Sequence, residues 1–79
     1  MSHVPHELAE EFPDKIDALH DSKMNDAHFV RLSDEYHEIN RQIHRVETGV
    51  EPTSQQFETE LRKKRMVLKD EIASILAKA

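Results

Sequence analysis

A regular heptad pattern runs through residues 29–50, FVRLSDEYHEINRQIHRVETGV. Its apolar positions are separated by alternating steps of three and four residues, which places them on one side of an α-helix. They are Phe29, Leu32, Tyr36, Ile39, Ile43, Val46 and Val50. A stripe with this period is typical of a helix that packs lengthwise against another helix. The pattern therefore predicts one long helix with a helical partner.

The residues that flank the stripe indicate where this helix begins and ends. Asn25 and Asp26 are good N-cap residues, because their side chains accept hydrogen bonds from the first helical turn. Gly49 is the only glycine in the chain, and glycine readily takes the left-handed conformation that often ends a helix. Pro52 follows, and a proline blocks continuation of the helix. We expect the first long helix at about residues 26–48.

A second long helix is expected over about residues 54–78, after a turn at 49–53. Its N-cap would be Thr53 or Ser54. Its apolar stripe consists of Phe57, Leu61, Leu68, Ile72, Ile75 and Leu76. A turn this short folds the two helices back on each other. The predicted fold class is all-α, an antiparallel helical hairpin within a single small domain that spans residues 1–79.

Two basic residues, Lys64 and Arg65, interrupt the apolar stripe of the second helix. In the antiparallel register Leu68 should lie opposite Tyr36, and Lys64 should lie near Ile39. We expect the stems of the two basic residues to cover the edge of the core while their charges reach water. Their expected partners across the seam are Glu35, Glu38 and Gln42. The hydroxyl group of Tyr36 is expected at the surface or bonded to a neighbour such as Arg65.

Ahead of the hairpin, the sequence predicts a flexible tail at residues 1–5 and a short N-terminal helical arm at about 6–23. Pro13 divides the arm, because proline ends one helical turn and suits the first position of the next. The apolar residues of the arm are Leu8, Phe12, Ile16 and Leu19. An arm this short is not stable alone. We expect it to dock near Phe29 and Ile75 at the open end of its own hairpin, or on a second chain.

Composition restricts the classes of function. Hydrophobic residues make up 37% and charged residues 34% of the 79 residues, so the core must be thin. The absence of cysteine excludes a disulfide framework and a thiolate zinc site. No apolar stretch is long enough to span a bilayer, and we expect no secretory signal and a cytoplasmic location. A formal net charge of −5 disfavours a general nucleic-acid binder.

The densest positive feature is a candidate strip for an anionic partner, formed by Arg62, Lys63, Arg65 and Lys69. Together with Arg41 and Arg45 of the facing helix, it could contact RNA, DNA or an acidic protein. The alternative is a solvated helix face that is paired with nearby carboxylates, namely Glu58, Glu60, Asp70 and Glu71. No aromatic platform lies beside the strip to stack a base. The solvated face is therefore the favoured interpretation.

Histidines suggest a metal site only weakly. His37 and His44 share one helix face, but Arg41 lies between them, and a cation site would not hold an arginine at its centre. The tail Met1-Ser2-His3 would suit copper or nickel only if Met1 were retained. No cluster supplies three or four ligands at a known spacing. We expect no metal and no cofactor.

Catalytic constellations are absent from the sequence. It has no cysteine nucleophile, no glycine-rich loop and no serine, histidine and carboxylate set that a hairpin would gather in one pocket. Two thin helices also cannot enclose a substrate. The chain is therefore not expected to be an enzyme.

Residues 61–72, LRKKRMVLKDEI, resemble the signature of the YdcH-like family of small bacterial proteins. Further positions upstream are similar to the rest of that pattern, namely Phe12, Pro13, Asp26, Phe29, Leu32, Tyr36, Ile39, Asn40, Ile43 and Glu47. The resemblance covers about residues 12–76, although Ile39 and Met66 stand where leucine is more usual. It implies a helical hairpin of bacterial origin in a domain of unknown function, and it provides no catalytic residues to carry over.

The thin core predicts association with another chain. A domain of this size rarely stabilises itself without a metal, disulfides or association. We predict an interaction protein that self-associates, with a dimer favoured, or docks on a larger protein. The predicted interaction seam comprises Phe29, Leu32, Tyr36, Ile39, Ile43, Val46, Leu61, Leu68, Ile72 and Ile75. The alternatives are a small RNA-, DNA- or ribosome-associated factor that uses Arg62–Lys69 and, less favoured, a histidine-based metal carrier.

Overall fold

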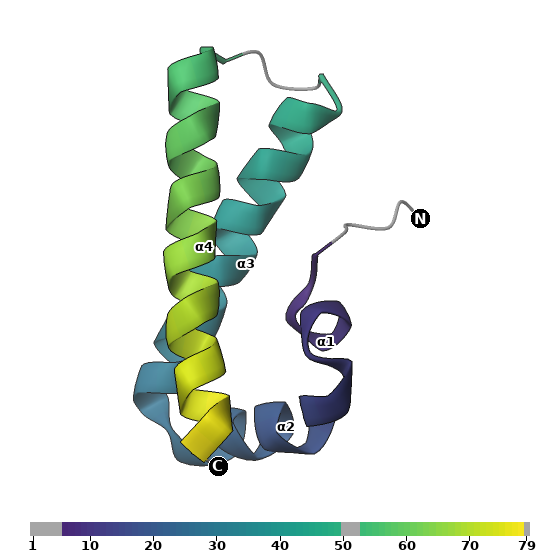
Figure 1. Ribbon diagram of the computed structural model, residues 1–79, viewed down its shortest axis with the longest axis vertical. Helices are drawn as coiled ribbons and strands as arrows, with labels where there is room; N and C mark the ends of the chain where they lie inside the picture. The colour runs from purple at the N-terminus through teal and green to yellow at the C-terminus, as the bar shows by residue number, and fades with distance from the viewer. Residues whose placement is uncertain (1–5, 50–52, 79) are drawn as a thin grey trace.

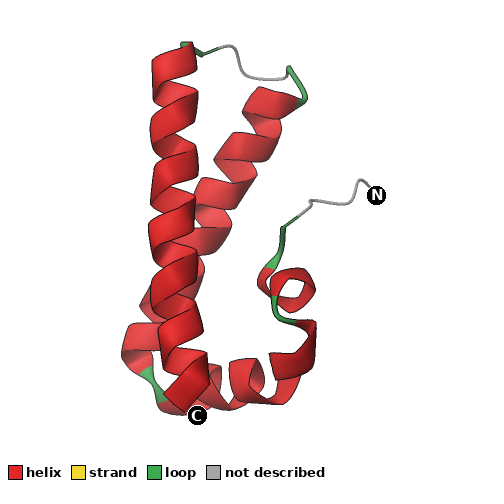
Figure 2. Cartoon of the chain, viewed as in Figure 1, coloured by secondary structure: helices red, strands yellow, loops and turns green. Residues whose placement is uncertain are grey.

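The computed structural model describes residues 6–49 and 53–78, and helices joined by short connections make up these ranges (Figures 1 and 2). In chain order the elements are α1 (Leu8–Glu11), the 3-10 helix η1 (Pro13–Lys15), α2 (Ile16–Asn25), α3 (Ala27–Glu47) and α4 (Gln55–Lys78). Helices α3 and α4 form an antiparallel hairpin, and α2 lies across the end where α4 finishes (Figure 1). The described ranges contain no strand, and the predicted all-α hairpin is confirmed.

The start of α3 follows from the chemistry of one side chain. Asp26 Oδ1 accepts hydrogen bonds from the backbone N–H groups of His28, at 3.0 Å, and Phe29, at 3.2 Å. These groups have no partner within the helix, so the carboxylate stabilises the first turn. Asn25 does not cap α3, because its side-chain amide donates to the Asp21 carbonyl at the end of α2. The predicted cap is therefore confirmed at Asp26.

The turn between the long helices also follows local rules. Gly49 has a φ of 77°, the left-handed conformation expected just after α3. At the start of α4, Ser54 Oγ accepts a hydrogen bond from the Phe57 N–H at 3.1 Å, so Ser54 is the confirmed cap. The predictions for the tail at residues 1–5 and for residues 50–52, Val50 included, lie outside the described residues.

The main core lies where α2, α3, α4 and the first turn of the arm meet. Its buried residues are Leu8, Leu19, Phe29, Leu32, Tyr36, Leu68, Ile72 and Leu76. Phe29, Tyr36 and Ile72 have no exposed surface, and the two aromatic rings supply the largest buried apolar areas. Ile43 and Leu61 are buried elsewhere along the hairpin. Most of the predicted seam is therefore hydrophobic core.

The edges of the predicted seam are only partly buried. Ile39 and Ile75 pack against the core from outside, and Val46 is half-buried. Phe57, expected in the apolar stripe of α4, is instead 48% exposed. It lies in the first turn of α4, where the two helices diverge toward the turn (Figure 1). The wider separation of the two helices there accounts for the exposed ring.

Across the hairpin, two expected pairings can be compared with the structure. Leu68 and Tyr36 lie in the same buried cluster, as predicted. Arg65 Nη1 donates to Asn40 Oδ1 at 3.0 Å, and not to the carboxylates expected from Glu35 or Glu38. Asn40 is only 1% exposed. A buried carboxamide needs a hydrogen-bond partner, and Arg65 supplies one.

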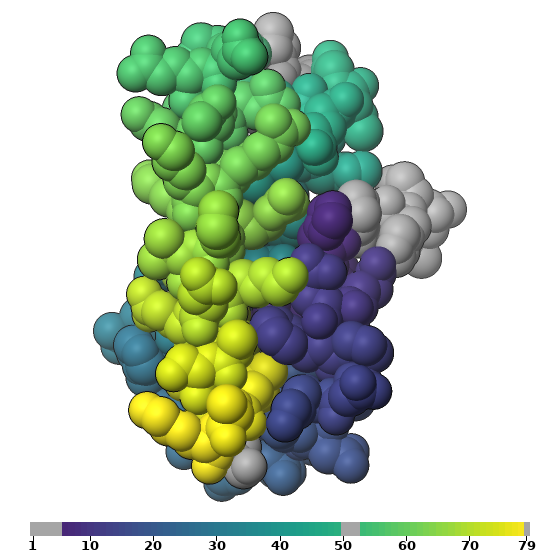
Figure 3. Space-filling view, viewed as in Figure 1, coloured from purple at the N-terminus to yellow at the C-terminus, as the bar shows by residue number. Residues whose placement is uncertain are grey.

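In the structure the N-terminal arm extends to the end of α2 and comprises residues 6–25, and it packs on its own hairpin. Figure 3 shows its side chains against those of α4, filling the gap that separates the ribbons. Leu8 and Leu19 are buried as expected, but Ile16 is 47% exposed. Ile16 is the first residue of α2, directly after the 3-10 segment, and the residues that α2 buries are Leu19 and Ser22. None of the described helices is both long and apolar enough to cross a membrane.

Candidate functional site

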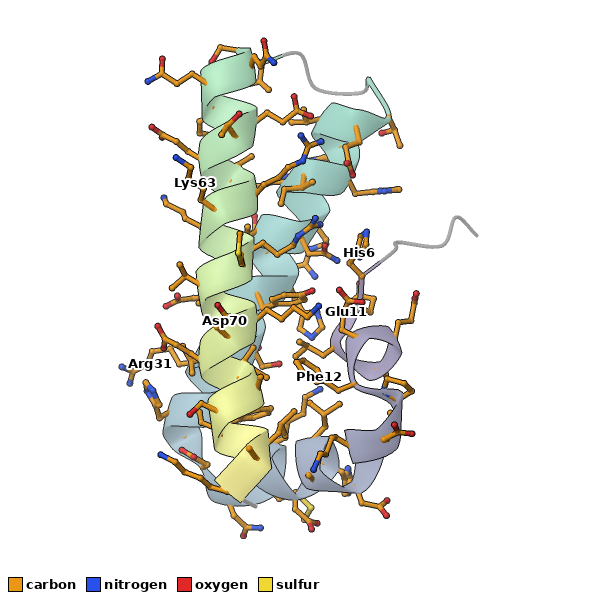
Figure 4. The ribbon with its side chains drawn as sticks, viewed as in Figure 1. His6, Glu11, Phe12, Arg31, Lys63 and Asp70 are labelled. Carbon is orange, nitrogen blue, oxygen red and sulfur yellow. The ribbon has the colours of Figure 1, made fainter. Side chains whose placement is uncertain are left out.

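The hairpin has two long faces with different surroundings. The arm covers one of them, called the arm face here, and the other is called the groove face. In Figure 4 the labelled arm residues His6, Glu11 and Phe12 lie on one side of α4, and Lys63 lies on the other. The hairpin therefore presents two separate candidate surfaces.

Polar contacts fix the arm to α4 on the arm face. Lys69 Nζ donates to Glu11 Oε1 at 3.0 Å, and the same ammonium lies 5.9 Å from the centre of the Phe12 ring. His6 Nδ1 lies 3.3 Å from the same Glu11 oxygen. The hydrogen bond from Lys69 is the main cause that lowers the pKa of Glu11, and partial burial opposes it. Glu11 thus connects the arm to the hairpin as a carboxylate.

A second set of contacts fixes the arm to α3. The Tyr36 hydroxyl donates to the His6 carbonyl oxygen at 2.5 Å. The hydroxyl is thus bonded to a neighbour, as one of the two expectations had it, but the acceptor is the His6 carbonyl and not Arg65, because the arm lies over this part of α3. Burial raises the pKa of Tyr36 to about 12, and the nearby Glu11 carboxylate acts in the same direction. Beside it, His37 Nδ1 lies 2.8 Å from Glu7 Oε2.

The predicted basic strip is divided between the two faces. Arg62 Nη2 bonds to Glu58 at 2.8 Å and to Glu47 at 2.9 Å. Arg65 donates to Asn40 and Lys69 donates to Glu11. Three candidate cations therefore have acceptors within the chain, but only the Arg62–Glu58 pair is one that the solvated-face interpretation named. Lys63 lies on the side of α4 away from the labelled arm residues (Figure 4).

An open apolar groove of about 560 Å³ lies between α3 and α4 on the groove face. The residues that line it are Glu35, Glu38 and Ile39 of α3 and Lys63, Lys64, Val67 and Leu68 of α4. Its floor is formed by Ile39, Val67 and Leu68, and Val67 is 56% exposed. Apolar side chains are thus accessible to solvent along the middle of this face.

The two rims of the groove carry opposite charges. Glu35 and Glu38 come from α3, and Lys63 and Lys64 come from α4. Glu38 is paired with Arg41 at 3.1 Å. Within residues 6–49 and 53–78, neither rim lysine has a carboxylate within 4 Å, and Glu35 has no cation within that distance. These three side chains are therefore available to an external partner of opposite charge.

A family model described as "Protein of unknown function (DUF465)" matches residues 29–76. The chain belongs to this family. The DUF465 match spans most of α3 and α4 and both rims of the groove, while the arm lies before it. Searches of the curated proteins and of the solved structures gave no match.

The sequence drew attention to most of the residues that line the groove, but it did not reveal the groove. It placed Ile39 near Lys64, and both residues line the groove. It did not single out Val67, which lies outside the apolar stripe of α4. The interruption of that stripe at Lys64 and Arg65 was the available signal, because a helix that lacks an apolar residue at the seam leaves space beside its neighbour.

The site is suited to binding by shape and charge. No group of three or more histidine, aspartate or glutamate side chains that could hold a metal ion occurs within the described ranges. His37, one of the histidines considered as a ligand, faces Glu7 on the arm face. The groove offers an apolar floor and two charged rims, the features by which proteins recognise an amphipathic helix.

Proposed function

We propose that this DUF465 chain is a small protein-interaction module whose α3/α4 groove binds an amphipathic helix of another protein chain. The observation that carries the proposal is the open groove itself, with its apolar floor between an acidic and a basic rim. Exposed apolar patches on small proteins commonly mark interaction sites. Helix-in-groove docking buries such a floor and leaves the charged rims to set orientation.

The expected partner helix has a definable chemistry. Apolar side chains spaced three and four residues apart would fill the space above Ile39, Val67 and Leu68. Basic side chains on one flank would meet Glu35, and acidic side chains on the other would meet the rim lysines. This pattern excludes a partner helix with a uniformly acidic or uniformly basic surface.

Three narrower statements belong to the same proposal. The chain is a YdcH-like member of the DUF465 family, acts in the cytoplasm, and works by binding and not by catalysis. The run LRKKRMVLKDEI at residues 61–72 supports the YdcH-like relationship. The openness of the groove supports binding over catalysis, because a catalytic site generally has to exclude water from the reacting groups.

The test is site-specific photocrosslinking in cells of the source organism. A photoreactive amino acid at position 67 lies in the groove, and the same amino acid at position 66 is the matched control. Met66 is 60% exposed, similar to Val67, but does not line the groove. We expect a defined covalent adduct with a protein chain from position 67 only. Equal adducts from both positions, or none from position 67, would contradict the proposal.

A further inference from the structure

We infer that the chain that fills the groove is a second copy of this protein, related to the first by a two-fold axis that runs along the groove. This inference rests on the proposed function and names its partner. The helices that enter the groove face are then the α3 and α4 of the other copy, and the product is a four-helix bundle with one arm on each outer face.

Self-complementarity of charge is the first argument. A two-fold interface places the same surface of each copy against the other, so that surface must match itself. Each copy carries an acidic rim on α3 and a basic rim on α4. Glu35, Lys63 and Lys64 have no ion-pair partner within the described ranges. A second copy supplies partners of the required sign for all three.

The charges also select the orientation of the axis. An axis along the groove places α3 of each copy on α4 of the other, so acidic rims meet basic rims. An axis across the groove would place α3 on α3 and α4 on α4, so Glu35 and Lys63 would meet like charges. Like-charge contacts at an interface are unfavourable. The selected arrangement puts both hairpin turns at the same end and makes every neighbouring pair of helices antiparallel.

Apolar contacts agree with this arrangement. The floors of two facing grooves bring Ile39 of one copy over Val67 of the other, and Val67 of the first over Ile39 of the second. Both side chains are partly or largely exposed in the single chain, so burial between copies removes apolar area from water. The arm is not displaced, because its contacts through Glu11 and Tyr36 lie on the opposite face.

Charge reversal tests the inference by sedimentation velocity over micromolar concentrations. Wild type should be a dimer. The variants K63E/K64E and E35K/E38K should each raise the dissociation constant of the dimer more than about tenfold, because each brings like charges together. A 1:1 mixture of the two variants should dimerise again. The fourfold variant E35K/E38K/K63E/K64E, which keeps the formal net charge of −5, should also recover the dimer.

The orientation of the axis is tested with a spin label. The chain has no cysteine, so Gln55→Cys at the start of α4 provides one labelling position per copy. The measured distance between labels should be well short of 38 Å, the long dimension of one copy. A distance near or above 38 Å would place the turns at opposite ends and would contradict the selected arrangement.

The outcomes separate the inference from the proposed function. A wild-type monomer that crosslinks to a different protein from position 67 would overturn the inference and leave the function intact. A dimer that tolerates both charge reversals would also overturn it. If wild type is a monomer and position 67 gives no adduct, both statements fail.

Discussion

Lys69 Nζ donates a hydrogen bond to Glu11 Oε1 across 3.0 Å, joining residues 58 positions apart in the chain. With the hydrogen bond from Tyr36 to the His6 carbonyl, this contact fixes the arm on its own hairpin. The arm therefore covers one face of α3 and α4 and leaves the groove face open.

Acid should weaken the arm contact through Glu11. The carboxyl pKa is lowered in the folded state, chiefly by Lys69, whereas in the unfolded chain it is close to 4.5. The contact therefore stabilises the fold above about pH 4.5, and this contribution is lost as the pH falls through the lower folded pKa. Glu11→Gln should cost less than about 1 kcal/mol at neutral pH, because the pair is partly exposed. Urea unfolding at several pH values should show a weaker acid dependence for the variant, and an unchanged dependence would contradict the contact.

Alkali should weaken the fold through Tyr36. Its pKa is about 12 in the fold and about 10 when unperturbed, so the unfolded chain ionises first. The stabilisation is complete below about pH 10 and is lost as the pH rises toward 12. Tyr36 is the only tyrosine and the chain has no tryptophan, so near-ultraviolet absorbance of tyrosinate reports this residue alone. A native titration near pH 10 would contradict the buried, hydrogen-bonded hydroxyl.

The matched variant for this test is Tyr36→Phe. It should cost about 1 kcal/mol at neutral pH, the usual net value of one lost hydrogen bond. It should also remove the tyrosine part of the alkaline loss of stability. Any loss that remains in the variant reports groups other than Tyr36.

Two leucine-sized side chains on the arm should differ sharply in their effect on stability. Leu8→Ala truncates a core side chain that is 3% exposed and should lower the free energy of unfolding by about 2–4 kcal/mol. Ile16→Ala is the control, because Ile16 is 47% exposed, and it should cost less than about 1 kcal/mol. Chemical unfolding followed by far-ultraviolet circular dichroism measures both. An equal loss of unfolding free energy in the two variants would mean that the arm does not pack as described.

The N-cap of α3 should contribute measurably to stability. Asp26→Ala leaves the backbone N–H groups of His28 and Phe29 without their acceptor and should cost about 1 kcal/mol. Asn25→Ala, at the adjacent position, removes only an exposed bond to the Asp21 carbonyl and should cost about 0.5 kcal/mol or less. Thermal unfolding of the two variants in parallel provides the comparison. A larger effect at Asn25 would reassign the cap.

Features that depend on a few neighbouring residues were predictable from the sequence. The cap at Asp26, the left-handed Gly49 and the new helical start at Pro13 each follow from the chemistry of one side chain. The heptad stripe likewise predicted that Phe29 and Tyr36 would be buried. Capping and periodicity act over short distances in the chain, so no tertiary information was required.

Features that depend on how separate elements meet were not predictable. The exposure of Ile16 depends on which side of α2 packs against the hairpin, and the apolar pattern of the arm does not specify that side. The contacts of Glu11 and Tyr36 depend on where the arm crosses the hairpin. The groove beside Val67 depends on the space left between two helices, and an apolar pattern specifies which residues are buried but not the distance between helix axes.

Sedimentation equilibrium of Val67→Asp beside Met66→Asp tests most directly whether the groove face is the surface that binds the second copy. Both side chains are exposed neighbours on α4, and only Val67 lines the groove. Both variants should keep the wild-type helical content. Val67→Asp should sediment as a monomer, because it places a charge in the apolar floor, and Met66→Asp should remain a dimer like the wild type. The same mass for both variants would contradict the account.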